Sequence, residues 1–553
     1  SPWQEGISYQ LLISDQITAT DGGKFSGDTI RFFIRTEPLQ LILRMENNQI
    51  MEVNQLNTEI SLHPVWELKL SHPVAENTLS DHLQWTGQNE QLVLSAQSDT
   101  LYTLTTNQPL DYYTSYELTV SGHLSEAVDR PFDETQYAFF TQLDSTYKFP
   151  LLSDEELLTL IQEQTFRYFW EGAEPNSGMA RERNTSGTTV TTGGTGFGLM
   201  AMIVAVERGF ITREDAVNRW SQIFHFLEKA DRFHGAWSHW INGSTGKVQP
   251  FSAKDNGADL VETAFLIQGM LTVRQYLNPG EPGEEELINL INELWEGVEW
   301  NWFTQNGENV LYWHWSPEYE WEINLPIRGH NETQITYVLA AASPGHSIAP
   351  EVYHEGYARS GNMKNGNSYY GEVLPLGPNM GGPLFFAHYS YLGMDPRKLE
   401  DYYAHYFNQN VSHTLINRAY CIDNPRNFVG YSEHCWGLTA SDGNEGYSAH
   451  SPTNDRGVIT PTAAISSIPY TPDESLDAIR HFYYLLGDRL WGEYGFYDAF
   501  NITEEWVADS YLAIDQGPII CMIENYRTGL LWELFMSAPE IQKGLQKLNI
   551  RYD

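Results

Sequence analysis

The sequence predicts a multidomain chain, a β-sandwich over residues 1–148 followed by an all-α toroid of the (α/α)6 type over residues 149–553. Before residue 150, short runs such as TIRFFIRT and YELTVSG alternate with turn signals such as DGG and TGQN, which is typical of antiparallel strands. After Leu151 the hydrophobic period lengthens to about 3.6 residues. Ser153 and Glu156 open this region at the spacing of a capping box.

The sandwich from about residue 60 resembles bacterial Ig-like modules in its opening KLSHPVAENTLSDHLQW and its closing strand FFTQL. The sequence leaves open whether residues 1–57 form a separate small β unit.

In the second part, polar helical stretches such as TREDAVNRWSQIFHFLEKA alternate with apolar ones such as GTGFGLMAMIVAV. This alternation favours an outer and an inner ring of helices over tandem helical repeats, for which no fixed period is visible. Helices are expected near residues 153–170, 194–208, 212–230, 255–277, 284–301, 331–342, 382–392, 397–418, 436, 461–467, 473–487 and 516–536.

Composition narrows the function classes. The 553 residues hold 72 Asp and Glu against 32 Lys and Arg, a formal charge of −40 that disfavours nucleic acid and anionic membranes as partners. No apolar run is long enough to span a membrane. Cys421, Cys435 and Cys521 form an odd set without a CxxC pair, so we expect core thiols and neither a disulfide framework nor a structural zinc. Scattered His residues and the spacing of the glycines predict no metal or nucleotide cofactor.

In residues 149–553, three apolar helical stretches each begin with an acidic residue. Asp255, Glu332 and Asp515 stand at these starts, and Asp259 and Glu262 follow Asp255 at i+4 and i+7 on one expected helix face. Because the same stripe continues as apolar residues, both sides of this helix are expected to be buried. The acids are therefore predicted to point into one enclosed mouth.

Simpler interpretations exist for each acid. The first group could be an exposed acidic stripe on an amphipathic helix. Asn331 could cap the second helix while Glu332 complements its dipole, and Asp515 could act only as an N-cap.

The loops of the second part are rich in aromatic and Gly-containing segments. Trp237 lies in GAWSHWINGSTG and Trp313 in WNWFTQNGENVLYWHWSPEYEWEINLP, and aromatic faces can bind the C–H faces of sugar rings or simply pack. Arg181 and Arg183 lie on the loop SGMARERNTSGTTVTTGG, which could instead be a solvated loop. HExxH and GxSxG are absent from the sequence. The simplest chemistry left is a pair of carboxyl groups on a glycosidic bond, one of them protonated.

Several long strings carry a family resemblance: KDNGADLVETAFLIQGML, the NET-initiated helix ending in LAAASPGH, HCWGLTASDG, GVITPTAAISSIPYTP and AIDQGPIICMIENYRTGLLW. Together they span residues 151 to about 545 and resemble the bacterial glucoamylase-like domain family that contains the β-1,2-glucanases. The resemblance implies an (α/α)6 barrel and inverting hydrolysis of β-1,2-glucan or its oligosaccharides, by endo action or by exo action that releases sophorose. The N-terminal sandwich is similar to that of some exo-acting members.

The resemblance also implies roles for single residues. Glu332 matches the general acid, and Asp515 is the candidate base, with Asp259 or Asp455 as alternatives. The substrate contacts that we expect are Asp255, Asp259, Glu262, Arg181, Arg183, Trp237, Trp313, Trp436, Asp442 and Asp455. Trp436 and Asp442 could instead be structural turn residues.

Other function classes stay open at this point. A polysaccharide lyase can use the same toroid but would want a basic cleft, and a transglycosylase or another β-glucan hydrolase would share the acids. A glycan-binding protein without activity would use the aromatic residues alone. The chain begins at Ser1 without Met, as a processed protein does, and we expect a periplasmic or secreted location.

Overall fold

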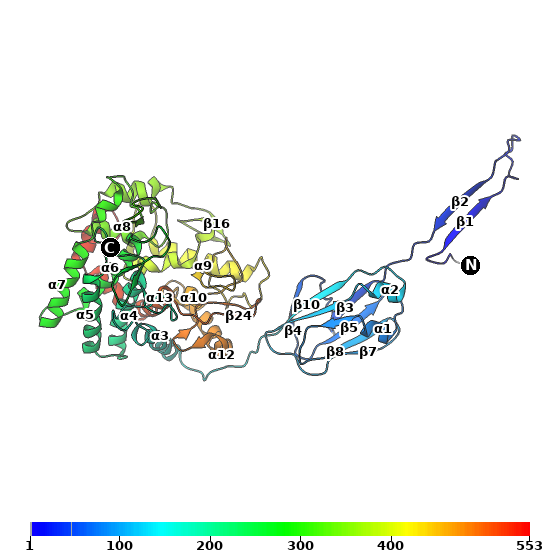
Figure 1. Cartoon of the computed structure of the whole chain (residues 1–553), viewed down its shortest axis with the longest axis horizontal. Coiled ribbons are helices and arrows are strands. Elements are labelled where there is room, and N and C mark those ends of the chain that lie inside the picture. Colours follow the sequence, from blue (N-terminus) through cyan, green and yellow to red (C-terminus); the bar gives the residue numbers. More distant parts are fainter. Residues whose placement is uncertain (1–2, 46, 553) are drawn as a thin grey trace. The chain divides into compact units, whose positions relative to one another are not determined.

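The computed structural model describes residues 3–45 and 47–552, and the chain forms two compact units, Ser1–Ser145 and Thr146–Asp553 (Figure 1). The sequence places the boundary at residues 148/149, close to the observed division.

Two four-stranded sheets make up most of the N-terminal unit. One has the order β3-β5-β8-β7 and the other the order β4-β10-β9-β6, and all neighbours are antiparallel except the parallel pair β4 and β10. The strands are β3 (Leu41–Met45), β4 (Leu56–Ile60), β5 (Val65–Leu70), β6 (Leu83–Trp85), β7 (Leu92–Ala96), β8 (Leu101–Thr106), β9 (Ser115–Val120) and β10 (Thr135–Thr141), with short helices α1 (Glu76–Ser80) and α2 (Leu124–Val128).

Side chains from both sheets form one core in this unit. Burial alternates along β5 with a period of two, which directs Trp66 and Leu68 inward. Trp66 contacts Phe139 of the other sheet, with 5.0 Å between the ring centroids. Among the described strands, β1 (Ser8–Ile13) and β2 (Asp28–Phe33) pair only with each other, whereas residues 41–60 contribute β3 and β4 to the two sheets.

The C-terminal unit is mainly helical, but the prediction that it is all-α is wrong. Its helices are α3 (Asp154–Trp170), α4 (Thr192–Arg208), α5 (Arg213–Lys229), α6 (Leu260–Tyr276), α7 (Pro282–Glu296), α8 (Gln334–Ala342), α9 (Tyr406–Asp423), α10 (Pro461–Ile465), α11 (Pro472–Arg480), α12 (Gly487–Leu490), α13 (Ala513–Arg527), α14 (Leu530–Met536) and α15 (Pro539–Lys547). Short strands form small antiparallel pairs between them: β11 (Thr189–Thr191), β12 (Trp240–Asn242), β13 (Val248–Gln249), β14 (Ala258–Asp259), β15 (His314–Trp315), β16 (Ser368–Tyr369), β17 (Glu372–Val373), β18 (Leu399–Glu400), β19 (Ala440–Ser441), β20 (Ser448–Ala449), β21 (Trp491–Gly492), β22 (Gly495–Phe496), β23 (Phe500–Asn501), β24 (Trp506–Val507) and β25 (Arg551–Tyr552).

Apolar helices pack side by side at the centre of this unit. Helix α4 lies against α6 and α13, α6 lies against α8, and α13 lies against α10. The backbones of α4 and α6 touch at Gly196 and Gly269, where an added Cβ on either residue would lie 2.2 Å from a carbonyl oxygen of the other helix. Only glycine allows this approach, so these two residues determine how closely α4 and α6 can pack.

An irregular segment, residues 382–392, connects α8 to the region after α10. Residues 382–392, which the sequence predicts to be a helix, form 3-10 turns η5 (Leu384–Ala387) and η6 (Tyr389–Tyr391) after Gly382 and Pro383. Tyr391 donates to Gln334 Oε1 of α8 at 2.7 Å, and Tyr470, beyond α10, donates to the Ala387 carbonyl at 2.8 Å. The segment thus bridges α8 and the region after α10.

Several other predicted helices differ from those observed. The structure contains no helix at residue 436, α9 begins only at Tyr406, and α11 ends at Arg480, where a π-helical turn follows. The expected helix 516–536 divides at Gly529, whose φ of 75° ends α13 and allows α14 to start. The three cysteines are buried and free, as expected for core thiols. Within the described residues, none of the helices could span a bilayer.

The three acidic helix starts are also placed differently from the prediction. Helix α6 begins at Leu260, so Asp259 is its N-cap and Asp255 precedes it. Glu332 precedes α8, and Asp515 lies in the first turn of α13 and not at its N-cap. The predicted i, i+4, i+7 stripe on one helix is therefore wrong, because only Glu262 of that group lies within the helix.

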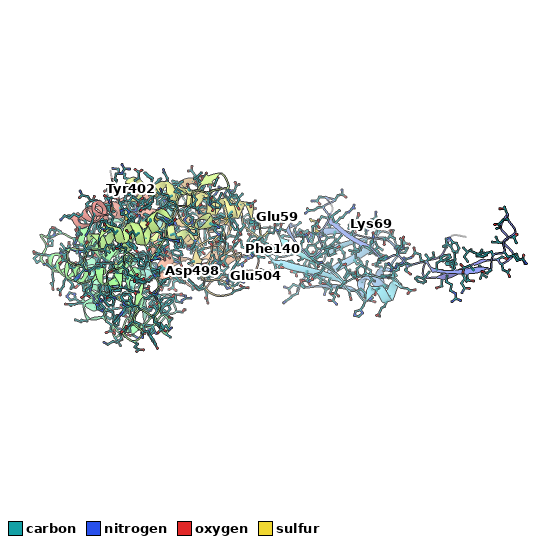
Figure 2. All side chains as sticks on the ribbon, turned by 90° about the horizontal axis from the view of Figure 1, so that it is seen from above. Glu59, Lys69, Phe140, Tyr402, Asp498 and Glu504 are labelled. Carbon is teal, nitrogen blue, oxygen red and sulfur yellow. The ribbon has the colours of Figure 1, made fainter. Side chains whose placement is uncertain are left out.

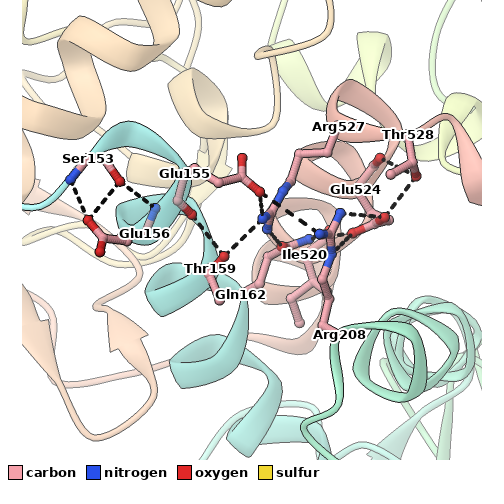
Figure 3. Close-up of polar contacts among 10 residues, drawn as sticks. All are labelled: Ser153, Glu155, Glu156, Thr159, Gln162, Arg208, Ile520, Glu524, Arg527 and Thr528. Atoms are coloured by element: carbon pink, nitrogen blue, oxygen red, sulfur yellow. Dashed lines mark hydrogen bonds and ion pairs between the residues drawn. The ribbon is translucent and has the colours of Figure 1, made fainter.

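A buried ion-pair network links α3, α4 and α13 (Figure 3). Glu524 of α13 is 1% exposed and accepts two hydrogen bonds of 2.8 Å from Arg208 of α4. Thr528 donates to the same carboxylate, and Gln162 of α3 connects it to Arg527. Because every oxygen of Glu524 has a donor, the buried charge is compensated.

Replacing Glu524 with Ala is expected to lower the free energy of unfolding by about 3 kcal/mol, since the partly buried Arg208 loses its buried carboxylate partner. Urea unfolding followed by far-UV circular dichroism measures the change. Glu163→Ala on the exposed face of α3 is the matched control and should change stability by less than about 0.5 kcal/mol. Equal effects of the two substitutions would contradict this view of the network.

Candidate functional site

Acidic residues from three parts of the C-terminal unit surround the side chain of Tyr389. Burial raises the pKa of Tyr389 well above its usual value, and Asp515, Glu262 and Glu332 add to the shift. The Tyr389 hydroxyl is buried without a hydrogen-bond partner in the described chain. The charges of Glu262 of α6, Glu332 before α8 and Asp515 of α13 therefore all act on one side chain.

Glu332 is a buried carboxyl group whose pKa lies near neutral pH. Burial raises its pKa to about 7, and the charges of Glu262 and Asp259 contribute to the rise. The residue is 9% exposed, so it keeps some contact with solvent. A carboxyl group in this state can hold a proton near pH 7 and donate it to a bound molecule.

Glu262 is held by the start of α4. The amide of Gly193 donates to Glu262 Oε2 at 2.8 Å, and a Cβ on Gly193 would lie 2.5 Å from that oxygen. The position thus requires glycine, because any side chain would displace the carboxylate. Burial raises the pKa of Glu262, and the nearby His239 opposes the rise.

Asp255, Asp259, His239 and His314 form a cluster beside Glu262. The β14–β15 pair places Asp259 opposite His314, and His314 Nε2 lies 3.5 Å from an oxygen of each aspartate. Asp259 Oδ1 accepts from the amides of Val261 and Glu262 at 3.0 and 2.9 Å, and His239 Nδ1 lies 3.1 Å from Oδ2. The N-cap of α6 therefore also orients two histidines.

The histidines and carboxylates of the cluster stabilise each other's charged forms. Burial would lower the pKa of His239, but Glu262, Asp259 and Asp255 together raise it to about 9. Burial tends to raise the pKa of Asp259, yet its hydrogen bonds to His239 and His314 lower it. The ligand atoms of His239, Asp255 and Asp259 lie within 4.8 Å of one another, close enough to hold a metal ion. The protonated His239 can supply positive charge at the same place.

A second acidic group lies at Asp515. Burial raises the pKa of Asp515 and the nearby charge of Asp498 adds to the rise, and Asp498 Oδ2 accepts from the Asp442 amide at 2.8 Å. Arg183 pairs with Asp442 at 3.0 Å, and Ser510 donates to the same carboxylate at 2.6 Å. The structure thus brings Arg183, Asp442 and Asp515 together, with Asp498 between them. Figure 2 labels Asp498 among the packed side chains of the C-terminal unit.

Tyr447 connects this group to solvent. It lies on the loop between β19 and β20 and is 51% exposed, although Asp515 and Asp498 beside it are almost fully buried. Partial burial raises the pKa of Tyr447, and the charges of Asp515, Asp498 and Asp442 add to the shift. An exposed phenol over buried carboxyl groups offers a ring face and a hydroxyl to a visiting molecule.

Three other predicted substrate contacts are tied into the structure. Trp237 is fully buried, donates to the Leu227 carbonyl at 3.2 Å, and has the Arg232 guanidinium over its ring. Trp436 is also fully buried. Arg181 donates to two backbone carbonyls, those of Gly187 and Gly172. These surroundings favour a structural role for the three residues over direct contact with substrate.

Trp313 and Asp455 lie in different surroundings. Trp313 is half-buried, with its ring stacked on His314 at 5.7 Å between centroids, so it borders the His–Asp cluster. Asp455 is buried and accepts from Tyr431 at 2.7 Å and Tyr420 at 3.1 Å. These contacts place Asp455 in a separate tyrosine-lined group.

The sequence interpretation missed Asp498, Tyr389, Tyr447, His239 and His314. Asp498 and Tyr447 lie in irregular loops without periodicity, and Tyr389 lies in the segment that was expected to be a regular helix. A signal did exist for His239 and His314, since each is next to a Trp of the aromatic loops.

Comparisons with known proteins identify the family that this chain resembles. The Glycoamylase family model, described as "Putative glucoamylase", matches residues 324–539. Over 445 residues the chain is 51% identical to the exo β-1,2-glucooligosaccharide sophorohydrolase (non-reducing end) of Parabacteroides distasonis, a match that covers 76% of this chain and 61% of the relative. The chain therefore spans less than two thirds of that protein's length.

Two solved structures are also similar. The endo-β-1,2-glucanase from Chitinophaga pinensis, in complex with sophorotriose and glucose, is 55% identical, and the match covers 72% of this chain and 99% of that one with a TM-score of 0.71. A β-1,2-glucanase from Parabacteroides distasonis is 40% identical, with 96% of this chain and 77% of that one covered and a TM-score of 0.70.

The charge of His239 can be tested directly by NMR of His-labelled protein, with His239→Gln to assign the signal. His239 is expected to stay protonated through pH 8, because its pKa of about 9 depends on the carboxylates around it. In Glu262→Gln this pKa should fall by roughly one unit or more. A signal that titrates near 6.5 in both proteins would contradict the charge assignment.

Proposed function

Because the chain belongs to the Glycoamylase family, we propose that it is a glycoside hydrolase that cleaves β-1,2-glucan or β-1,2-glucooligosaccharides. The observation that carries the proposal is Glu332, a carboxyl group that stays protonated to about pH 7 while Glu262 and Asp515 lie around the same tyrosine. Two relatives more than 50% identical are named for action on β-1,2-linked glucose chains.

The proposed reaction is inverting. Glu332 gives its proton to the glycosidic oxygen as the bond to the anomeric carbon breaks, while a water attacks that carbon from the opposite face and loses a proton to Asp515. An inverting pair needs about 6.5–9.5 Å between its carboxyl groups to leave room for the water. Separate elements supply the two acids, and this arrangement is compatible with such a gap.

The remaining groups around the acids are proposed to bind sugar. Asp255, Asp259 and Glu262 would accept hydrogen bonds from hydroxyl groups, and Trp313 would offer a ring face. Arg183 and Asp442 would support the opposite side at Asp515. The buried Trp237 and Trp436, with Arg181 and Asp455, which hydrogen-bond within the protein, would hold the loops that carry these contacts.

We also infer the finer architecture. The ring of α4, α6, α8, the 384–391 segment, α10 and α13 supports an (α/α)6 barrel with one irregular inner member. The two sheets of the N-terminal unit support an Ig-like sandwich. A periplasmic or secreted location is proposed with them, since a polysaccharide is met outside the cytoplasm.

Exo action with release of sophorose is the proposed mode. The relative named for this activity is 51% identical over 445 residues, and the match to a β-1,2-glucanase of the same organism extends over 96% of this chain. Chromatography of the products decides this point, since sophorose alone supports exo action and a ladder of oligomers contradicts it.

A lyase or a non-catalytic glycan-binding protein fits the site less well. A lyase acts on uronates and needs positive charge, whereas the groups facing Tyr389 and Glu332 are carboxyl groups. Glycan binding alone does not require a carboxyl group whose pKa burial raises to about 7, whereas proton donation to a glycosidic oxygen does.

Glu332→Gln is expected to lower product formation from β-1,2-glucan by at least about 100-fold, because the amide cannot donate the acid proton. Binding of sophorotriose, measured by calorimetry, should persist. Glu163→Gln is the matched control and should keep full activity. Tests on β-1,2, β-1,3, β-1,4 and α-1,4 glucans give the linkage, and absence of product from all four with the unaltered protein would refute the proposed function.

The pH dependence of kcat/KM should follow Glu332. The acid is active when protonated, and its pKa is raised to about 7, so activity is expected to fall tenfold per pH unit well above that pH. The midpoint of this fall in kcat/KM gives the pKa of Glu332 in the free enzyme. Activity that stays constant to pH 9 would show that Glu332 is not the acid.

A further inference from the structure

An exposed phenylalanine, Phe251, lies directly beside the His–Asp cluster. Its ring centroid lies 4.4 Å from that of His239 and 4.8 Å from that of Trp240. Phe251 is 51% exposed, so its ring contributes little to a hydrophobic core. Single exposed apolar side chains are common on protein surfaces, and the meaning of this one therefore depends on how it is held and on what lies next to it.

Hydrogen bonds, and not core packing, fix the position of Phe251. Its amide donates to the Asp255 carbonyl at 3.0 Å, and the Asp255 amide donates to the Ser252 carbonyl at 3.1 Å, which closes residues 251–255 into a tight turn. Lys254 forms an ion pair with Glu322 of the Trp-rich loop. The turn thus ties the exposed ring to Asp255 of the cluster.

The same aromatic residues are built on the start of α4. Strand β12 places Trp240 opposite Thr191 of β11 and Gln249 of β13, and Phe251 follows β13 by two residues. The Thr192 amide donates to the His239 carbonyl at 3.1 Å. Because the next residue of α4, Gly193, holds Glu262, the aromatic rings and this acid share one rigid support.

Solvent exposure rises from the cluster toward Phe251. Asp259 is fully buried, Asp255 is 7% exposed, and the side chain of His239 is 25% exposed. The cluster is therefore reached by solvent on the side where His239 contacts the Phe251 ring. A sugar ring needs an apolar surface for its C–H face and polar groups for its hydroxyls, and this place offers both.

We propose that Phe251 is a substrate-binding residue, whose ring stacks on the C–H face of one glucose unit of the β-1,2-linked chain while His239 and Asp255 bind hydroxyl groups of that unit. Trp240 packs against the ring and keeps it upright. This inference rests on the proposed hydrolase function, and it adds an aromatic wall to the site on the side of the His–Asp cluster.

The proposed contact has a defined kinetic signature. Phe251 touches a bound glucose unit and neither the acid nor the water that react, so the contact is equally strong before and during bond cleavage. Interactions of this kind change KM and leave kcat almost unaltered. A ring that only shielded the His239–Asp259 pair from water would act differently, since its removal would change the pKa of His239 and lower kcat.

The test measures binding of short β-1,2-glucooligosaccharides of increasing length by calorimetry, in the Glu332→Gln background that does not turn them over. Phe251→Ala should raise Kd by about 5- to 10-fold for every chain long enough to reach the ring. Phe251→Leu keeps apolar volume but loses the flat face and should weaken binding nearly as much, whereas Phe251→Tyr should stay within about twofold of the parent. Phe33→Ala, at a 58% exposed phenylalanine of β2, is the matched control and should leave Kd unchanged.

The active enzyme with the same substitutions should show the rise in KM with kcat within about twofold of wild type. Thermal melts identify any variant that fails to fold, and Leu and Tyr carry the test if Ala does not fold. Unchanged Kd at every chain length, full binding by the Leu variant, or a loss confined to kcat with a shifted His239 pKa would each overturn the stacking role and leave the hydrolase function intact. Failure of the unaltered protein to release product would instead overturn the proposed function, while the calorimetry still reports on Phe251.

Discussion

The close approach of several buried carboxyl groups, with few cations among them, is the constraint on which the site depends. Glu262, Glu332 and Asp515 all act on Tyr389, and Asp259 and Asp498 stand beside them. In such surroundings an ionised carboxylate is costly, so protons are held at pH values where exposed acids have lost them. The chemistry of the site follows from this cost, since a protonated Glu332 is its direct consequence.

Packing and hydrogen-bond contacts of the helices and strands hold the buried carboxyl groups close together. The glycines between α4 and α6 bring Gly193 to Glu262, and the β14–β15 pair sets His314 opposite Asp259. At the other ends of α4 and α13, the fully bonded Glu524 ties these helices to α3. The packed helices thus stabilise the fold, and this stability offsets the unfavourable free energy of grouping the buried carboxyl groups. Functional sites often combine an unfavourable arrangement with a stable scaffold in this way.

Sequence reasoning succeeded where the signal is local. The capping box at Ser153 and the periodicity behind it place α3 within a residue or two, and the periodicity of residues 212–230 does the same for α5. It failed where contacts between distant segments decide, as in the 384–391 segment, whose bonds to Gln334 and Tyr470 replace a helix. Asp498 is joined to Asp515 and Asp442 only through the fold, so no spacing could reveal it. That Glu332 and Asp515 share one mouth stays a prediction from their helix starts, and each of those starts was misjudged by a few residues.

The central claim is that acids from separate helices meet on one glycosidic bond. A crystal structure of Glu332→Gln with a β-1,2-glucooligosaccharide tests it most directly. The account predicts a glycosidic oxygen within hydrogen-bond distance of the side chain at position 332, and a water on the opposite face of the sugar ring toward Asp515. An oligosaccharide bound away from Tyr389, with neither acid near a glycosidic bond, would contradict it.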